Sequence, residues 1–280
     1  MKKYLITFAA GSINYIEAGE RLVEQGNNLK LFDKSILFTD KNLMNDKIFW
    51  DKHSDFIKKN KRGFGYWLWK PYIILKTMNE LENGDILLYL DCGCEFIENN
   101  KDLIIKYFDY VKKDKIIGNE IKTLEGQFSK MDLIDYLKLN NENILKSYQR
   151  EAGANMFYVN GKTRKLVEEW YNIGSEYNFI DDSSSKLKNI NGFKEHRHDQ
   201  SIFSLLTKKY NIYSKQKITK IILSGRNRTG FSSNDFLFFI KIPLSNFFSI
   251  SKKKTNKILI NIFIIFFFIY LYKKSYIFVT

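Results

Sequence analysis

An acidic residue that directly follows an apolar run is the strongest candidate for chemistry in this 280-residue chain. Residues 86–90 read Ile-Leu-Leu-Tyr-Leu, and Asp91, Cys92 and Gly93 come next. Such a run predicts a buried strand, and ligands of open α/β sheets bind where such strands end. We therefore expect the Asp91 carboxylate to face a phosphate or a metal, with Gly93 leaving the backbone accessible. The alternative is that Asp91 only caps the turn after the strand.

Two further residues are candidate partners of Asp91 in a metal site. Glu95 lies four residues further on, and two carboxylates suit a hard divalent cation, which prefers oxygen ligands. His198 can complete such a site, although a histidine at a helix start is more often solvated. The sequence thus predicts Asp91, Glu95 and His198 as metal ligands.

Cations and aromatic residues are found on both sides of this strand in the sequence. We expect Lys70, Arg226 and Arg228 to stabilise a leaving phosphate, whose negative charge grows in the transition state. Each cation also has a simpler interpretation, as a surface charge or as part of a basic tail. Trp67 and Trp69 suit stacking on a base or a sugar, but this spacing is equally typical of core aromatic residues.

Two polar segments later in the chain can supply a proton acceptor. Asp199, followed by Gln200, opens a predicted helix, so it is an N-cap, a general base that activates a hydroxyl, or a residue that only orients the bound sugar. Glu151 lies in a turn with Gly153, and a glycine there would let a sugar approach the backbone. We therefore expect Asp199 and Glu151 to be catalytic, and Gly153 to leave room for the molecule that Glu151 contacts.

Residues 65–71, Gly-Tyr-Trp-Leu-Trp-Lys-Pro, and residues 91–95, Asp-Cys-Gly-Cys-Glu, resemble segments of GT-A glycosyltransferases from bacterial and viral surface-polysaccharide clusters. The resemblance covers roughly residues 1–225 and implies a Rossmann-like sheet, a nucleotide-sugar donor and a Mn²⁺ or Mg²⁺ ion that bridges the diphosphate. It also implies that the pair Asp199 and Gln200 lines the acceptor side. The chain departs from the family's Asp-x-Asp pattern at Gly93, which concerns the metal more than the fold.

The elements that would position these residues follow an α/β order. Residues 4–9 and 35–39 are apolar strands separated by a helical pattern over residues 16–29, which is a β-α-β opening. Pro71 suits the first turn of a second helix, which Gly84 ends before the strand at residues 86–90. The glycine fingerprints of dinucleotide-binding and P-loop enzymes are missing, as are a nucleophile elbow and a zinc-binding helix. The sequence predicts a mostly parallel sheet flanked by helices.

The positive charge of the chain is concentrated at its C-terminal end. Of the formal net charge of +14, residues 215–280 carry +11, from twelve Lys and Arg against Asp235. Fourteen Phe and Tyr in residues 231–278 favour an anionic membrane surface over nucleic acid. The apolar run at residues 258–272 would form a helix of about 22 Å, short of the ~30 Å hydrocarbon core, so we expect it to lie at the interface. A buried core element and a disordered tail are the alternatives.

These observations together predict a catalytic domain, residues 1–225, and a basic hydrophobic membrane-associating segment, residues 226–280. The residues predicted to bind the donor are Asp91, Gly93, Lys70, Trp67, Trp69 and Arg226. The two cysteines, one residue apart, form neither a disulfide framework nor a zinc site and indicate a reducing compartment. We expect a glycosyltransferase on the cytoplasmic side, peripheral to the inner face of a membrane, with a nucleotide-sugar donor and a glycan or lipid-linked acceptor.

Two other functions stay open on the sequence alone. A sugar nucleotidyltransferase would need a glycine- and arginine-rich phosphate loop after the first strand, and residues 11–14, Gly-Ser-Ile-Asn, contain no cation. A non-catalytic membrane-surface binding protein would use the tail for attachment and the sheet for protein contacts.

Overall fold

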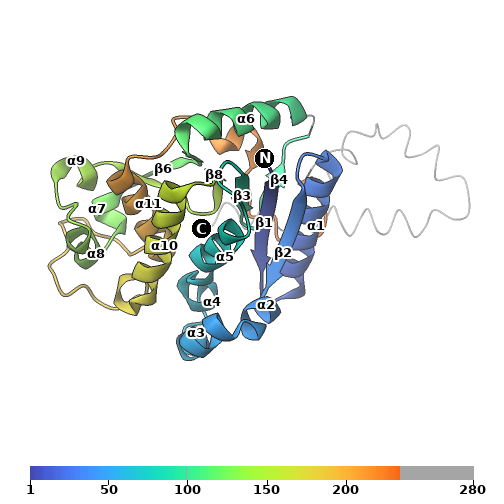
Figure 1. Ribbon diagram of the computed structural model, residues 1–280. Coiled ribbons are helices and arrows are strands. Elements are labelled where there is room, and N and C mark those ends of the chain that lie inside the picture. The colour runs from blue at the N-terminus through green and yellow to red at the C-terminus, as the bar shows by residue number, and fades with distance from the viewer. Residues whose placement is uncertain (99, 234–280) are drawn as a thin grey trace, which may run out of the picture. The chain divides into compact units, whose positions relative to one another are not determined.

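A five-stranded sheet forms the centre of the protein. The computed structural model describes residues 1–98 and 100–233. The sheet has the strand order β2-β1-β3-β8-β5 (Figure 1). β2, β1 and β3 are parallel neighbours, and β8 runs antiparallel to both β3 and β5. The strands span Lys3–Ala9 (β1), Lys34–Thr39 (β2), Ile86–Leu90 (β3), Ile116–Ile117 (β5) and Ala154–Tyr158 (β8).

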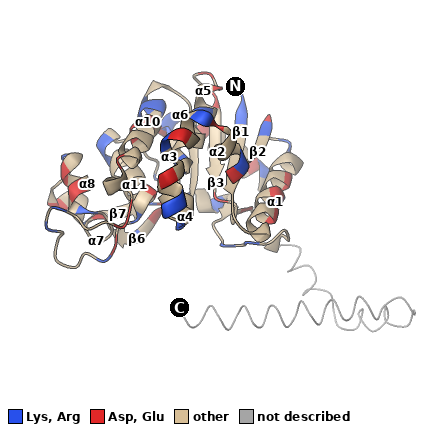
Figure 2. Ribbon diagram, turned by 90° about the horizontal axis from the view of Figure 1, so that it is seen from below, with Lys and Arg blue, Asp and Glu red and all other residues tan. Residues whose placement is uncertain are grey.

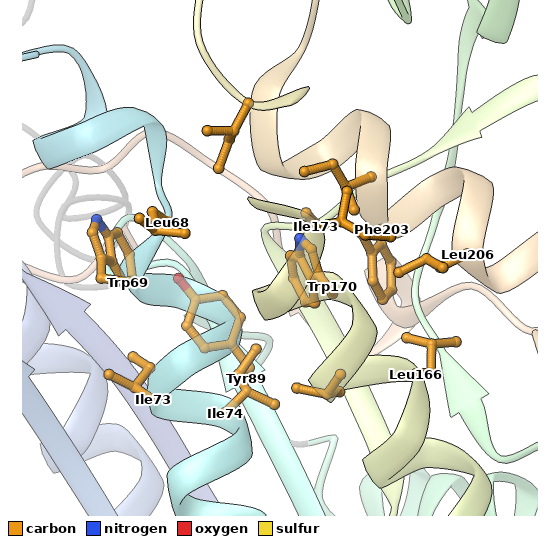
Figure 3. Close-up of a cluster of buried hydrophobic side chains, with 14 of the residues drawn as sticks. Leu68, Trp69, Ile73, Ile74, Tyr89, Leu166, Trp170, Ile173, Phe203 and Leu206 are labelled. Carbon is orange, nitrogen blue, oxygen red and sulfur yellow. The ribbon is translucent and has the colours of Figure 1, made fainter. Parts of the chain in front are cut away.

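Helices cover both faces of this sheet. α1 (Ile13–Leu29) and α6 (Lys101–Asp114) contribute side chains to the core beneath Leu88 of β3. α5 (Trp69–Asn79), α10 (Gly161–Ser175) and α11 (His198–Tyr210) contribute to the core on the other face, which holds Tyr89 of β3. Figure 3 shows Tyr89 among side chains of α5 and α10. Because both faces are covered, β3 is apolar at each of its positions and buried throughout.

Short helices and two small sheets complete the described part of the chain. β4 (Glu95–Phe96) pairs with β9 (Ile222–Leu223), and β6 (Glu120–Leu124) pairs with β7 (Tyr148–Arg150), both antiparallel. The other helices are α2 (Asp40–Asn45), α3 (Lys47–Lys59), α4 (Gly63–Tyr66), α7 (Glu125–Phe128), α8 (Met131–Tyr136), α9 (Glu142–Leu145), η1 (Tyr177–Phe179) and η2 (Ile218–Lys220). Figure 2 shows both acidic and basic residues along α3, so the charge of this helix is mixed.

The predicted α/β architecture is confirmed. Four of the five central strands point the same way, helices flank the sheet, and β3 has the predicted bounds. The helix expected to open at Asp199 instead begins at His198 with Arg197 as its N-cap, so the N-cap interpretation of Asp199 is wrong.

The predicted division of the chain into residues 1–225 and 226–280 can be compared with the structure only as far as residue 233. Met1–Ser232 forms one compact unit. Within residues 1–98 and 100–233, no helix has the length and apolar character needed to cross a membrane. The apolar run at residues 258–272 lies outside the described residues, so its association with a membrane stays a prediction.

Candidate active site

The Asp91 side chain lies where β3 ends, and neighbouring groups fix its orientation. The Tyr89 hydroxyl donates a hydrogen bond of 2.5 Å to Asp91 Oδ1, and the Asp91 N–H donates one of 2.7 Å to the Gly153 carbonyl. A Cβ atom on Gly153 would stand only 2.6 Å from Asp91 Oδ2. Gly153 therefore makes room for this carboxylate, whose side chain remains 46% exposed.

Lys70 is buried beside Asp91 and joins it to Asp199. The Lys70 ammonium lies 3.4 Å from Asp91 Oδ1 and 3.2 Å from Asp199 Oδ2, with 4% of its side chain exposed. Burial alone would lower the pKa of Lys70, but the charges of Asp199 and Asp91 together raise it, so the lysine stays cationic. Three residues predicted from separate segments thus meet at one point.

A left-handed turn before α5 brings Lys70 to this position. Residues 64–67 all have φ angles between 54 and 83°. Trp69 closes the turn, because its Nε1 donates a 2.9 Å hydrogen bond to the Gly63 carbonyl and its ring stacks on Phe8 with centroids 3.7 Å apart. The aromatic residues of the 65–71 segment therefore help to start α5 with Lys70 in its first turn.

The two predicted stacking residues, Trp67 and Trp69, have different surroundings. Trp69 is 5% exposed and belongs to the core, which favours the core interpretation over contact with a ligand. Trp67 is half-buried, and its ring centroid lies 5.6 Å from that of His198. Of the two, Trp67 therefore has the side chain that a ligand can reach.

Asp199 is nearly enclosed at the start of α11. Burial raises the pKa of Asp199 to about 6, with Asp91 adding to the rise and Lys70 opposing it. Only 5% of the Asp199 side chain is exposed, which leaves little surface for an acceptor hydroxyl to contact. Gln200 is half-buried, and its Nε2 donates a 3.0 Å hydrogen bond to Gln149 Oε1.

Glu151 is a second acid on the exposed side of the site. Its Oε1 would lie 3.6 Å from a Cβ on Gly153, close to Asp91. Burial raises the pKa of Glu151, and the negative charge of Asp91 raises it further. The hydrogen bond from Asn119 and the positive charge of Lys70 act in the opposite direction and lower this pKa. The two acids named as catalytic from the sequence thus differ: Asp199 is buried and ion-paired, and Glu151 is partly accessible.

Glu95 holds the segment that leads into the tail. Its Oε1 accepts a 2.8 Å hydrogen bond from Asn227 Nδ2, and its Oε2 accepts one of 3.1 Å from Ser232 Oγ. The Arg21 guanidinium lies in the same region and donates to five backbone carbonyls, at 2.8–3.3 Å, those of Cys92, Cys94, Asn227, Thr229 and Phe231. We call Arg21 and Glu95 the clamp.

Gly93 lies where this segment crosses the loop after β3. A Cβ on Gly93 would stand 3.0 Å from the Gly225 carbonyl oxygen and 3.3 Å from Arg226 Cα. The Asn227 N–H also donates to the Gly93 carbonyl at 3.2 Å. Gly93 therefore packs closely against the backbone of residues 225–227, which would have to shift slightly to admit a side chain there.

The three predicted metal ligands do not come together. Glu95 is held in the clamp, and the His198 ring stacks on Tyr66 with its Nδ1 2.7 Å from the Ile180 carbonyl. No group of three or more His, Cys, Asp or Glu in the described ranges could hold a metal ion. Asp91, with an exposed carboxylate, still suits a divalent cation that takes its other ligands from phosphates and water, as Mg²⁺ commonly does.

The segment held by the clamp brings two arginines to the ends of β1 and β3. Arg226 is exposed next to Gly93, and the Arg228 guanidinium lies 4.9 Å from the ring centroid of Tyr15, near the start of α1. The positive charge of Arg228 also acts on the Cys92 thiol, whose pKa burial raises to about 11. These arginines are therefore near the Asp91 loop, as expected of cations that meet a phosphate.

Tyr89, Arg21 and Asn119 are not evident as site residues from the sequence. Tyr89 gives a faint signal, since it is the one hydroxyl-bearing residue in an otherwise aliphatic run. Arg21 resembles any polar residue of an amphipathic helix, and Asn119 resembles a loop residue. Their roles depend on contacts with residues far away in the chain.

No protein-family model and no curated protein matches the chain. Similar solved structures include mouse xyloside xylosyltransferase 1, with TM-score 0.42, 9% identity, and coverage of 78% of this chain and 86% of that one. The galactosyltransferase LgtC, in complex with donor and acceptor sugar analogues, gives a TM-score of 0.40, 13% identity, and coverage of 72% and 70%. The bifunctional glycosyltransferase WbbM gives a TM-score of 0.42 at 12% identity, with coverage of 78% of this chain and 39% of that one. At these values, neither residues nor activity can be carried over to this chain.

Proposed function

We propose that the protein is a GT-A type glycosyltransferase, which transfers a sugar from a nucleotide-sugar donor to a glycan or lipid-linked acceptor. The meeting of Lys70, Asp91 and Asp199 at the end of β3 is the observation that carries this proposal. Lys70 belongs to the 65–71 segment, Asp91 to the strand end and Asp199 to the Asp-Gln pair, each of which resembles a glycosyltransferase segment. Three segments that resemble the same family therefore contribute to one site.

The donor side of the proposed site is the loop after β3 and the segment that crosses it. Asp91 is the exposed carboxylate there, and Arg226 and Arg228 are nearby cations for the diphosphate. As the bond between the sugar and the diphosphate breaks, negative charge grows on the leaving group, which fixed cations stabilise. A Mn²⁺ or Mg²⁺ ion held by Asp91 would supply the same stabilisation when bound.

The acceptor side of the proposed site is the turn that contains Glu151 and Gly153. Glu151 is partly accessible, and Gly153 keeps space beside Asp91. Lys70 neutralises part of the charge of the two aspartates, which eases the approach of an anionic donor to this acidic site. We place the whole protein on the cytoplasmic face of a membrane, held by its basic and aromatic tail, as the composition of residues 226–280 supports.

A donor screen with the full-length protein tests the proposal. Nucleotide sugars with uridine, guanosine, cytidine and thymidine bases are added with and without Mn²⁺, and the unfolding temperature is measured. A donor at ~100 times its dissociation constant adds about 2.7 kcal/mol to the free energy of unfolding. We expect one donor to stabilise the wild type and Asp109→Asn, an exposed control, but to stabilise Asp91→Asn much less. If no donor stabilises the wild type under either condition, the proposal is wrong.

A further inference from the structure

Three hydrogen bonds hold Glu151 in a fixed orientation. Its N–H donates to the Asn119 carbonyl at 2.8 Å, and its carbonyl accepts from Asn155 Nδ2 at 2.9 Å. Its side-chain Oε2 accepts from Asn119 Nδ2 at 3.1 Å. Asn119 therefore binds both the backbone and the carboxylate of Glu151, so the second oxygen, Oε1, has a defined position on the Gly153 side.

Asn119 is itself fixed, and its amide has a defined orientation. Asn119 as a whole is 6% exposed, and its Oδ1 accepts from the backbone N–H and the hydroxyl of Thr219, both at 3.3 Å. Because a backbone N–H can only donate, the atom facing Thr219 is the oxygen, and the NH₂ group faces Glu151. The Tyr213 hydroxyl, at 3.0 Å from the Asn119 carbonyl, secures the backbone.

The two candidate bases differ in what an acceptor can reach. Asp199 has a side chain that is 5% exposed, and Lys70 lies 3.2 Å from its Oδ2. Glu151 is only partly buried, and no hydrogen bond from a described residue reaches its Oε1. A general base must come within hydrogen-bonding distance of the hydroxyl that it deprotonates, which favours Glu151.

We propose that Glu151 accepts the proton of the acceptor hydroxyl through Oε1, and that Asn119 is a positioning residue that holds Oε2. This inference rests on the proposed glycosyl transfer. As the acceptor oxygen bonds to the sugar, its proton moves to Glu151, and the bond from the sugar to the nucleoside diphosphate breaks. The bond electrons leave with the diphosphate, and Glu151 later returns the proton to water.

The surroundings of Glu151 determine how Asn119 acts on its charge. Asp91, in the loop after β3, and Lys70, in α5, act electrostatically on Glu151. Burial raises the pKa of Cys94 and of Tyr213, and the charge of Glu151 raises both further, so these two groups are also close to it. Asn119 donates to the ionised carboxylate and so lowers the pKa of Glu151 against the effect of burial. Loss of this hydrogen bond should therefore raise the pKa of Glu151.

The test compares Asn119→Ala with Asn100→Ala. Asn100 also donates through its side-chain amide to the η2 segment, at 2.9 Å from the Lys220 carbonyl, but does not bind Glu151. The full-length protein is labelled with ¹³C at the glutamate carboxyl carbon, and the Glu151 signal is assigned as the one missing in Glu151→Gln. We expect Asn119→Ala to raise the titration midpoint of Glu151 by about one pH unit, and Asn100→Ala to leave it unchanged.

The pH dependence of donor turnover is the second readout. The acidic limb of kcat/KM should move upward with the Glu151 midpoint in Asn119→Ala, and Asn119→Asp should move both further because it adds a negative charge. Equal Glu151 midpoints in Asn119→Ala and Asn100→Ala would overturn the positioning role, as would lower activity without a shifted limb. If the wild type turns over no nucleotide sugar, the proposed function fails, and the titration still decides whether Asn119 controls Glu151.

Discussion

The Lys70 ammonium lies 3.2 Å from Asp199 Oδ2, and both side chains are at most 5% exposed. This ion pair joins the first turn of α5 to the first turn of α11 beneath Asp91. Its two residues come from segments 129 positions apart in the sequence, so their meeting is a property of the fold. The pair supports the Asp91 carboxylate from the protein side, and the other face of Asp91 remains exposed.

Replacement of Lys70 tests the importance of this pair for stability. Lys70→Met leaves Asp199 buried without its cation, and removal of one partner of a buried pair costs about 3–5 kcal/mol. We expect this loss in the free energy of unfolding, measured with urea. Lys70→Met with Asp199→Asn should recover a large part of it, since the only carboxylate then left without its cation is that of Asp91, which is 46% exposed. A double variant as unstable as Lys70→Met would contradict the pairing.

Asp199 should also make stability depend on pH. Its pKa in the folded protein is about 6, above the 3.8 of an ordinary aspartate, so the folded state holds this proton more tightly than the unfolded state. The stability contributed by this group is therefore present at low pH and falls as the pH rises from about 4 to about 6. Urea unfolding of the wild type and Asp199→Asn should show the wild type losing stability relative to the variant over this range. A difference that stays constant would count against the elevated pKa.

The clamp should control the order of the segment that crosses Gly93. Arg21→Lys keeps the charge but cannot donate to five carbonyls at once. We expect faster amide hydrogen exchange at residues 224–232 and weaker donor binding. Arg164→Lys is the matched control, because Arg164 also donates to backbone carbonyls, those of Met78 and Leu81, outside the site. Unchanged hydrogen exchange at residues 224–232 in Arg21→Lys would show that the clamp does not order this segment.

Metal dependence should follow Asp91 and not Glu95. Glu95 is 2% exposed and its carboxylate accepts from Asn227 and Ser232, whereas Asp91 is accessible. If Mn²⁺ strengthens donor binding, Asp91→Asn should abolish the added effect, and Glu95→Gln should retain it. Calorimetric titration of the donor with Mn²⁺ or EDTA measures both. Loss of the Mn²⁺ effect in Glu95→Gln alone would restore Glu95 as a ligand.

The sequence predicted those features that depend on local pattern. The apolar run at residues 86–90 sets β3 and, with it, the position of Asp91 at a strand end, because a strand covered on both faces excludes polar side chains. The β-α-β opening and the helix after Pro71 follow from periodicity in the same way. The position of Asp91 directly after β3 and the helix that carries Lys70 could therefore be predicted from the sequence.

The features that were not predicted depend on residues distant in sequence. Nothing near Glu95 indicates that Asn227 and Ser232 will engage it, and nothing near Asn119 indicates Glu151. The sequence also leaves open whether Trp69 stacks on a ligand or belongs to the core, since only the fold places Phe8 against its ring. Spacing along the chain can suggest a metal site at Asp91 and Glu95, but side-chain direction decides it.

Enzymatic release of a nucleoside diphosphate tests the central claim most directly. The donor that stabilises the protein is incubated with the full-length wild type and with Asp91→Asn, and the diphosphate formed is measured over time. Because Asp91 is the exposed carboxylate at the centre of the proposed site, we expect release by the wild type and a loss of about 10²-fold or more in the variant. Equal rates in the two proteins, or no release by the wild type with a bound donor and a range of sugar acceptors, would contradict the account.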